Sequence, residues 1–146
     1  MERKVSKKKV SMNPYLRKFW RTIARNRVLY GGRSSSKSWD AAAEAIKIAR
    51  FCKVRFLCTR QFQNKISESV YALLKIQIER FSLQDEFHIT KTSIEHKVTG
   101  SVFMFYGLWA NIDEIKSLES IDICWIEEAH NLTEEQWEIL EPTLRN

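Results

Sequence analysis

The stretch VLYGGRSSSKSWDAAAEAI, residues 28–46, decides the fold. It sets an apolar segment, a loop rich in glycine and serine, and a helical pattern in direct succession. Gly31, Lys37 and Ser38 meet the P-loop pattern G-x-x-x-x-G-K-[ST]. Ser36 stands where the second glycine is expected, and glycine there allows a close phosphate approach that a side chain resists. The loop is therefore either a phosphate-binding loop with one substitution or a serine-rich turn before a helix.

The flanks of this loop favour phosphate binding. Residues 27–30, RVLY, have the pattern of a short buried strand, and from Ser38 onward apolar residues recur at steps of three and four, which predicts a helix. A helix that opens directly after such a loop offers an anion free backbone N–H groups and a partial positive charge.

A second motif lies far along the chain, where Glu127 and Glu128 directly follow the apolar strand pattern IDICWI, residues 121–126. A P-loop enzyme needs an acidic residue at the end of a neighbouring strand to hold Mg²⁺, and a second carboxylate to orient or deprotonate the attacking water. The alternative is a pair of exposed charges at a strand end. Because both motifs occur in the expected order, the sequence favours a nucleoside triphosphatase.

Elsewhere, predicted strands and helices alternate. The pattern predicts strands at residues 54–60, at two segments between 87 and 107 joined by a turn at Thr99 and Gly100, and at 121–126, with helices at 13–24, at 64–81, within 111–120 and from Thr133. In the first helix, Tyr15, Phe19 or Trp20, and Ile23 share one face and are expected to pack in the core. This alternation implies an α/β fold, with a mainly parallel sheet covered by helices on both faces.

Charge divides the chain into an arm and a domain. The 146 residues suffice for one domain, but residues 1–27 carry ten Lys or Arg against one Glu, whereas the remainder is net negative. We expect residues 1–12 to be a basic flexible arm, either solvated or in contact with nucleic-acid phosphates, and residues 13–146 to be the domain. Three cysteines without metal-site spacing indicate reduced, buried thiols, and no apolar run suits a membrane span or signal peptide.

Longer segments resemble a known family. FLCTRQFQNKISESVYALL (56–74), FMFYGL (103–108) and EIKSLESIDICWIEEAHNLTEEQWEILEPTLR (114–145) are similar to the N-terminal ATPase domain of bacteriophage terminase large subunits, the motors that package DNA. The likeness extends from about residue 13 to residue 146 and includes long segments outside the two motifs.

The resemblance implies a P-loop NTPase of the RecA-like (ASCE) type that binds ATP and Mg²⁺. Lys37 would contact the β- and γ-phosphates, and Ser38 and Glu127 would ligate Mg²⁺. Glu128 would activate water, and Arg33 would act as a finger-like catalytic arginine. The nucleotide-binding loop would comprise Gly31, Gly32, Arg33, Ser34, Ser35, Ser36, Lys37 and Ser38.

The resemblance also implies a role and partners. The domain would power packaging of viral DNA into procapsids in the bacterial host cytoplasm, away from any membrane. Its partners would be double-stranded DNA, a small terminase subunit and a portal protein, with a homo-oligomeric ring for the full-length protein. The coupling motif and nuclease domain of the family have no counterpart in these residues, so we expect an ATPase domain truncated at its C-terminus, weakly active or inactive alone and without nuclease activity.

Two alternatives remain open. EEAH, residues 127–130, is close to the motif of superfamily 2 helicases, and a helicase-like ATPase fragment would turn Arg60 and Gln61 toward nucleic acid. A catalytically inactive, nucleotide-binding prophage remnant is the other, because Ser36 and an incomplete sheet would leave the loop less preorganised.

Overall fold

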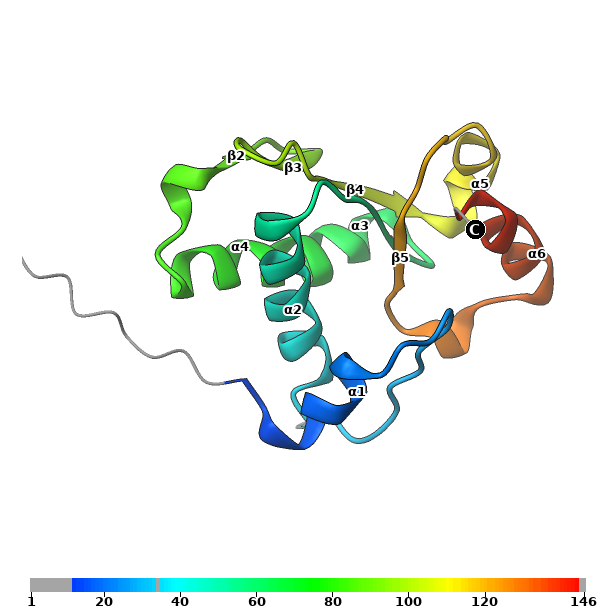
Figure 1. Ribbon diagram of the computed structural model, residues 1–146. Helices are drawn as coiled ribbons and strands as arrows, with labels where there is room; N and C mark the ends of the chain where they lie inside the picture. The colour runs from blue at the N-terminus through cyan, green and yellow to red at the C-terminus, as the bar shows by residue number, and fades with distance from the viewer. Residues whose placement is uncertain (1–11, 34, 145–146) are drawn as a thin grey trace, which may run out of the picture.

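The computed structural model describes residues 12–33 and 35–144. It contains a five-stranded mixed sheet in the order β2-β3-β4-β1-β5, flanked by helices (Figure 1). The strands are β1 (Arg55–Arg60), β2 (Phe87–Ile89), β3 (Ser93–His96), β4 (Val102–Gly107) and β5 (Ile123–Ile126). Strands β4, β1 and β5 are mutually parallel, and β2 and β3 add an antiparallel hairpin beside β4. The predicted α/β fold is confirmed.

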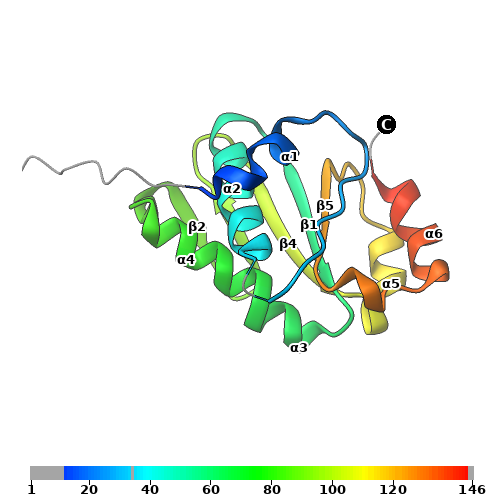
Figure 2. The ribbon, with the colours of Figure 1, turned by 90° about the horizontal axis from the view of Figure 1, so that it is seen from below.

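Helices lie on both faces of the sheet (Figures 1 and 2). The α-helices are α1 (Arg17–Arg21), α2 (Lys37–Phe51), α3 (Gln63–Ile66), α4 (Ala72–Arg80), α5 (Leu108–Lys116) and α6 (Glu134–Thr143). A π-helical turn, Ser67–Tyr71, joins α3 to α4, and 3₁₀ turns cover Pro14–Leu16, Gln84–Glu86 and Ala129–Asn131. No helix among the described residues is long and apolar enough to cross a membrane.

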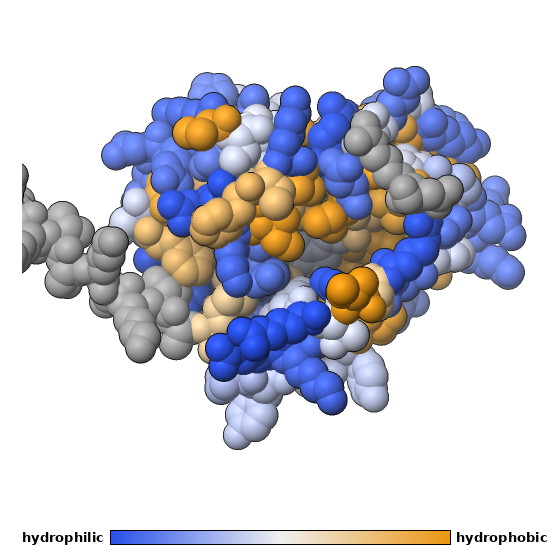
Figure 3. Space-filling model, in the orientation of Figure 1, coloured by the Kyte–Doolittle hydropathy of each residue, from blue (hydrophilic) through white to orange (hydrophobic). Residues whose placement is uncertain are grey.

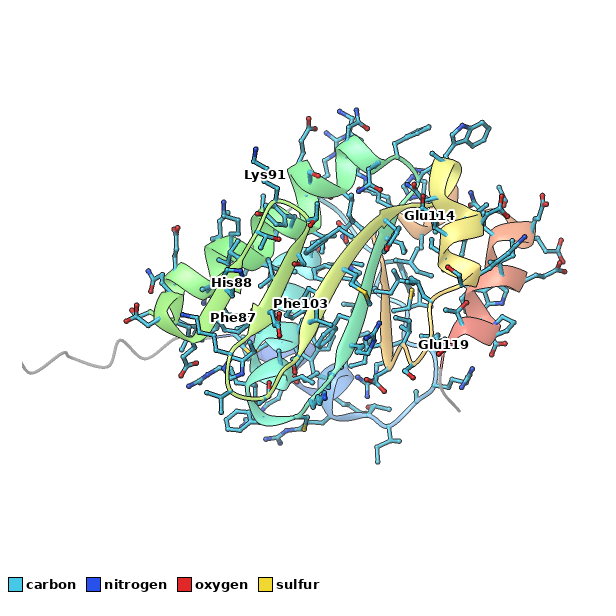
Figure 4. The ribbon with its side chains drawn as sticks, turned by 90° about the horizontal axis from the view of Figure 1, so that it is seen from above. Phe87, His88, Lys91, Phe103, Glu114 and Glu119 are labelled. Atoms are coloured by element: carbon cyan, nitrogen blue, oxygen red, sulfur yellow. The ribbon has the colours of Figure 1, made fainter. Side chains whose placement is uncertain are left out.

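Alternation along the parallel strands divides the core in two. Phe56 and Phe103 face α2, α3 and α4, and their rings stack with centroids 4.3 Å apart. Leu57 faces the opposite way and packs with α5 and α6. Successive residues of a strand point to opposite faces, so β1 supplies both cores at once. Figure 4 shows Phe103 on β4 and Phe87 on β2, at the antiparallel side of the sheet.

The prediction of a buried strand at residues 27–30 is wrong. No regular element forms there, and Val28 and Tyr30 are 76% and 92% exposed. A strand must pair its backbone with a neighbouring strand, and residues 27–30 pair with none of the five strands, not even at the free edge of β5. The segment between α1 and the serine-rich loop instead contacts α6, because Arg25 in this segment forms an ion pair with Glu141 at 2.8 Å.

Other predictions need smaller corrections. The N-terminal helix is reduced to a 3₁₀ turn and α1, and Tyr15 and Ile23 are exposed rather than packed in the core. The segment after residue 87 forms two strands, because the hydroxyl of Thr90 accepts the N–H of Ser93 and closes a turn inside it. Other predicted elements, from the helix after Ser38 to the capped final helix, are confirmed.

The three cysteines differ in exposure. Cys58 on β1 and Cys124 on β5 lie within the sheet, and burial raises the pKa of both thiols, that of Cys124 to about 12. Cys52, directly after α2, is exposed, which corrects the expectation of three buried thiols.

The face seen in Figure 1 is apolar in its middle and hydrophilic around its rim (Figure 3). The free edge of the sheet at β5 lies on this side (Figure 1). The candidate loop enters α2 beside it.

Candidate functional site

The serine-rich loop enters α2 through two unusual backbone positions. Gly31 has φ 147°, and Ser36 has φ 56° and ψ 16°, in the left-handed region where glycine is favoured. Lys37 is the first residue of α2. Ser36 thus adopts a backbone conformation suited to the glycine that the P-loop pattern expects at its position. Ser34 lies outside the described residues.

The ammonium of Lys37 is enclosed by its own loop. It donates to the carbonyl oxygens of Gly31 and Gly32 at 2.8 and 2.9 Å, and to the hydroxyl of Ser35 at 2.9 Å. A cation surrounded by neutral oxygens can exchange them for phosphate oxygens, which are stronger acceptors. The loop therefore presents one positive charge at a helix N-terminus, as an anion-binding loop requires.

The two sequence motifs meet at Ser38 and Glu127. The Ser38 hydroxyl donates to Oε1 of Glu127 at 2.6 Å, across 89 positions of sequence. The indole N–H of Trp125 donates to Oε2 of the same carboxylate at 3.0 Å. Sheet pairing fixes this strand end, because the N–H of Glu127 donates to the carbonyl of Thr59 at 2.9 Å.

This pair of oxygen donors suits Mg²⁺. Mg²⁺ prefers oxygen ligands, keeps several waters, and is commonly held by one or two protein groups together with substrate phosphates. The hydroxyl of Ser38 and the carboxylate of Glu127 provide two such groups beside the loop. Within residues 12–33 and 35–144, no cluster of three or more His, Cys, Asp or Glu could hold a metal by itself.

Glu128 and Arg33, predicted as catalytic, lie at the edge of this arrangement. Glu128 has φ 54°, and its partly exposed carboxylate is 3.3 Å from Nδ1 of His130. A non-glycine residue held in the left-handed region is typical of functional turns. Arg33 is exposed, and no ion pair joins it to Glu127 or Glu128 within the described residues. The structure therefore does not bring Arg33 to the carboxylates.

An N-terminal contact supports the loop from the other side. The backbone N–H of Asn13 donates to the carboxylate of Asp40 at 3.1 Å, and its side-chain amide donates to Ser36 Oγ at 3.0 Å. Asp40 is 2% exposed and lies in the first turn of α2. Sequence reasoning missed both contacts: the Asn-Pro pair signals a helix start, but nothing in it identifies the partner across 27 positions.

Trp125 was also missed. The signal available was a single tryptophan within the strand pattern IDICWI, two residues before a candidate metal ligand. Two residues along a strand is the spacing that returns a side chain to the same face.

Comparison with known proteins identifies relatives over nearly the whole chain. The sequence profile of the phage terminase large subunit family matches residues 23–146. The terminase large subunit of Bacillus phage SPP1 is 28% identical over 142 residues, which cover 90% of this chain and 33% of that protein. The chain therefore spans about a third of the length of this relative.

Proposed function

Because the chain belongs to the phage terminase large subunit family, we propose that it is an ATP-binding and ATP-hydrolysing domain of such a subunit, the part that powers packaging of viral DNA into procapsids. The observation that carries this proposal is the 2.6 Å hydrogen bond between Ser38 and Glu127. It brings the end of the serine-rich loop and the acidic strand end into one site.

Each residue has a physical role in this proposal. Lys37 leaves its carbonyl partners and binds the β- and γ-phosphates, which lie over the N-terminus of α2. Ser38 and Glu127 hold Mg²⁺, which neutralises negative charge on the phosphate oxygens when bound. Glu128 orients the attacking water and accepts its proton. Arg33 lies on an exposed part of the loop, and we assign it to stabilising the negative charge that develops on the transferred phosphoryl group.

The wider role rests on family membership. Double-stranded DNA, a small terminase subunit and a portal protein are the proposed partners, and a homo-oligomeric ring is the proposed assembly of the full-length subunit. The bacterial host cytoplasm is the proposed location. We propose these partners for a complete terminase large subunit, because this chain spans only about a third of the SPP1 relative.

Thermal unfolding with and without nucleotide tests the site. With Mg²⁺ and a non-hydrolysable ATP analogue at about 100 times the dissociation constant, binding to the folded state alone adds about 2.7 kcal/mol of stability. We expect this stabilisation in the wild-type chain and its loss in Lys37→Ala. Lys47→Ala is the matched control, because Lys47 is an exposed lysine on the same helix that forms an ion pair with Glu44 at 3.9 Å. A wild-type chain that melts cooperatively without any shift at millimolar nucleotide would contradict the proposal.

An inactive nucleotide-binding remnant is the second candidate, and one observation favours it. Ser36 has a left-handed backbone conformation that costs a non-glycine residue about 1–2 kcal/mol, so the backbone of the serine-rich loop is strained at this position. Phosphate release separates the two candidates. An active domain releases phosphate from ATP and loses this activity in Glu128→Gln, whereas a remnant shows the thermal shift alone.

A further inference from the structure

We propose that Trp125 is a positioning residue: its indole N–H holds the carboxylate of Glu127 in the orientation that a divalent cation requires. This inference rests on the proposed nucleotide and Mg²⁺ site. It adds to that site a residue that touches neither nucleotide nor metal.

Both oxygens of Glu127 are held by hydrogen bonds from different elements. Ser38, in the first turn of α2, donates to Oε1 at 2.6 Å, and Trp125, on β5, donates to Oε2 at 3.0 Å. Hydrogen bonds to an ionised group are shorter and stronger than those between neutral groups. A carboxylate held at both oxygens cannot rotate without losing one bond, so its lone pairs keep a fixed direction.

Trp125 is itself fixed in place. It pairs with Cys58 in the parallel ladder between β5 and β1, and the hydroxyl of Thr59 donates to its carbonyl at 3.2 Å. Its ring packs partly buried against the core beneath α2 and α4. Because a buried indole N–H normally needs an acceptor, turning the ring away from Glu127 would lose both packing and that hydrogen bond.

The position in the strand explains why this residue can act on Glu127. Side chains two residues apart along an extended segment share a face, and Glu127 directly follows β5, so Trp125 and Glu127 lie on the side of the sheet that faces α2, whose first turn carries Ser38. The intervening Ile126 packs in the opposite core with α5 and α6. An indole is an uncharged donor, so it fixes the carboxylate without competing electrostatically with a cation. In metal sites, partners that orient a ligand commonly alter metal affinity about 10–100-fold when removed.

The test uses the 146-residue chain and two tryptophan variants. Trp125→Phe keeps an aromatic ring on β5 but removes the N–H donor. Trp109→Phe is the control, because Trp109 is 71% exposed on α5. Binding of a fluorescent ATP analogue is measured in EDTA and across a Mg²⁺ titration. We expect Trp125→Phe to raise the Mg²⁺ concentration at half-maximal binding about tenfold, with binding in EDTA unchanged; Trp109→Phe should match the wild type in both.

Other outcomes would overturn the inference in distinct ways. An unchanged Mg²⁺ midpoint in Trp125→Phe means that the indole does not position the metal ligand. Equal weakening with and without Mg²⁺ means that the residue acts only through packing. Absence of nucleotide binding by the wild-type chain contradicts the proposed function itself, before any variant is compared.

A spectroscopic measurement covers the case in which Trp125→Phe does not fold. The chain contains five tryptophans, so an amide-correlation NMR spectrum of the wild type shows five indole N–H signals, and phenylalanine variants of the other four assign that of Trp125 by exclusion. Adding Mg²⁺ to the nucleotide-bound protein should shift the Trp125 signal most. If this signal stays in place while others move, the indole does not sense the metal ligand.

Discussion

Replacing Ser36 tests whether the loop has the backbone of a glycine position. At φ 56° a residue with a Cβ is strained by about 1–2 kcal/mol relative to glycine. Glycine gains about 0.4–1 kcal/mol more conformational entropy on unfolding, which offsets part of that relief. Ser36→Gly should therefore be more stable than Ser36→Ala by roughly 0.5–1 kcal/mol, the difference between these two terms.

The serine itself should resemble the glycine variant. Its hydroxyl accepts the side-chain amide of Asn13 at 3.0 Å, a hydrogen bond worth about 1 kcal/mol that both variants lose. We therefore expect Ser36→Ala to be the least stable of the three proteins, with an unfolding temperature about 2–3 °C below that of Ser36→Gly.

Ser35 provides the matched control. It neighbours Ser36 but does not have a positive φ, so there the order should reverse, with Ser35→Ala more stable than Ser35→Gly. Urea unfolding followed by circular dichroism measures all four variants. Equal stability of Ser36→Ala and Ser36→Gly, or the same alanine preference at both positions, would refute the left-handed conformation and the argument built on it.

Three further predictions concern stability and reactivity. A Cβ at Gly107 would lie 2.3 Å from a backbone nitrogen, so Gly107→Ala should cost at least about 1–3 kcal/mol in urea unfolding, whereas Gly32→Ala, with nothing within 4 Å, should not share this penalty. The hydrogen bond from Arg50 lowers the pKa of Glu86 in the folded protein. The stability that this ion pair contributes is therefore present above the unfolded pKa of about 4.3 and is lost as the pH falls through the lower folded pKa. Glu86→Gln should flatten the fall in unfolding free energy at acid pH, and an unaltered pH dependence would contradict the assignment. Cys52 should react first with iodoacetamide at pH 8, read by peptide mass spectrometry, because burial raises the pKa of the two sheet thiols; faster labelling within the sheet would count against their burial.

The sequence predicts the fold well where local pattern and burial agree. The helix from Ser38 and the strand before Glu127 follow from spacing alone, because the helix buries a continuous apolar face and the strand is a mostly apolar run. The strand prediction at residues 27–30 is wrong because local pattern and burial disagree there. Three apolar residues after Arg27 are compatible with a strand, but the backbone partners that would make them one are a tertiary property.

The candidate site is predictable in its members more than in its geometry. Motif spacing names Ser38 and Glu127, and the structure places them in contact. The supporting contacts of Trp125 and Asn13 depend on which elements meet in space, which spacing cannot encode. Arg33 is named by resemblance, yet among the described residues no ion pair joins its exposed side chain to either carboxylate.

The contact between Ser38 and Glu127 also has a consequence for folding. It closes a loop of 89 residues, whose closure entropy is about 4 kcal/mol before the additive constant. Glu127 directly follows β5, which is held in the sheet by pairing with β1, so the contact depends on the sheet between these two residues. A ligand that bridges these two residues would consequently slow hydrogen exchange throughout the central sheet, and not only in the loop it touches, because releasing it requires the most distant parts of the fold to separate.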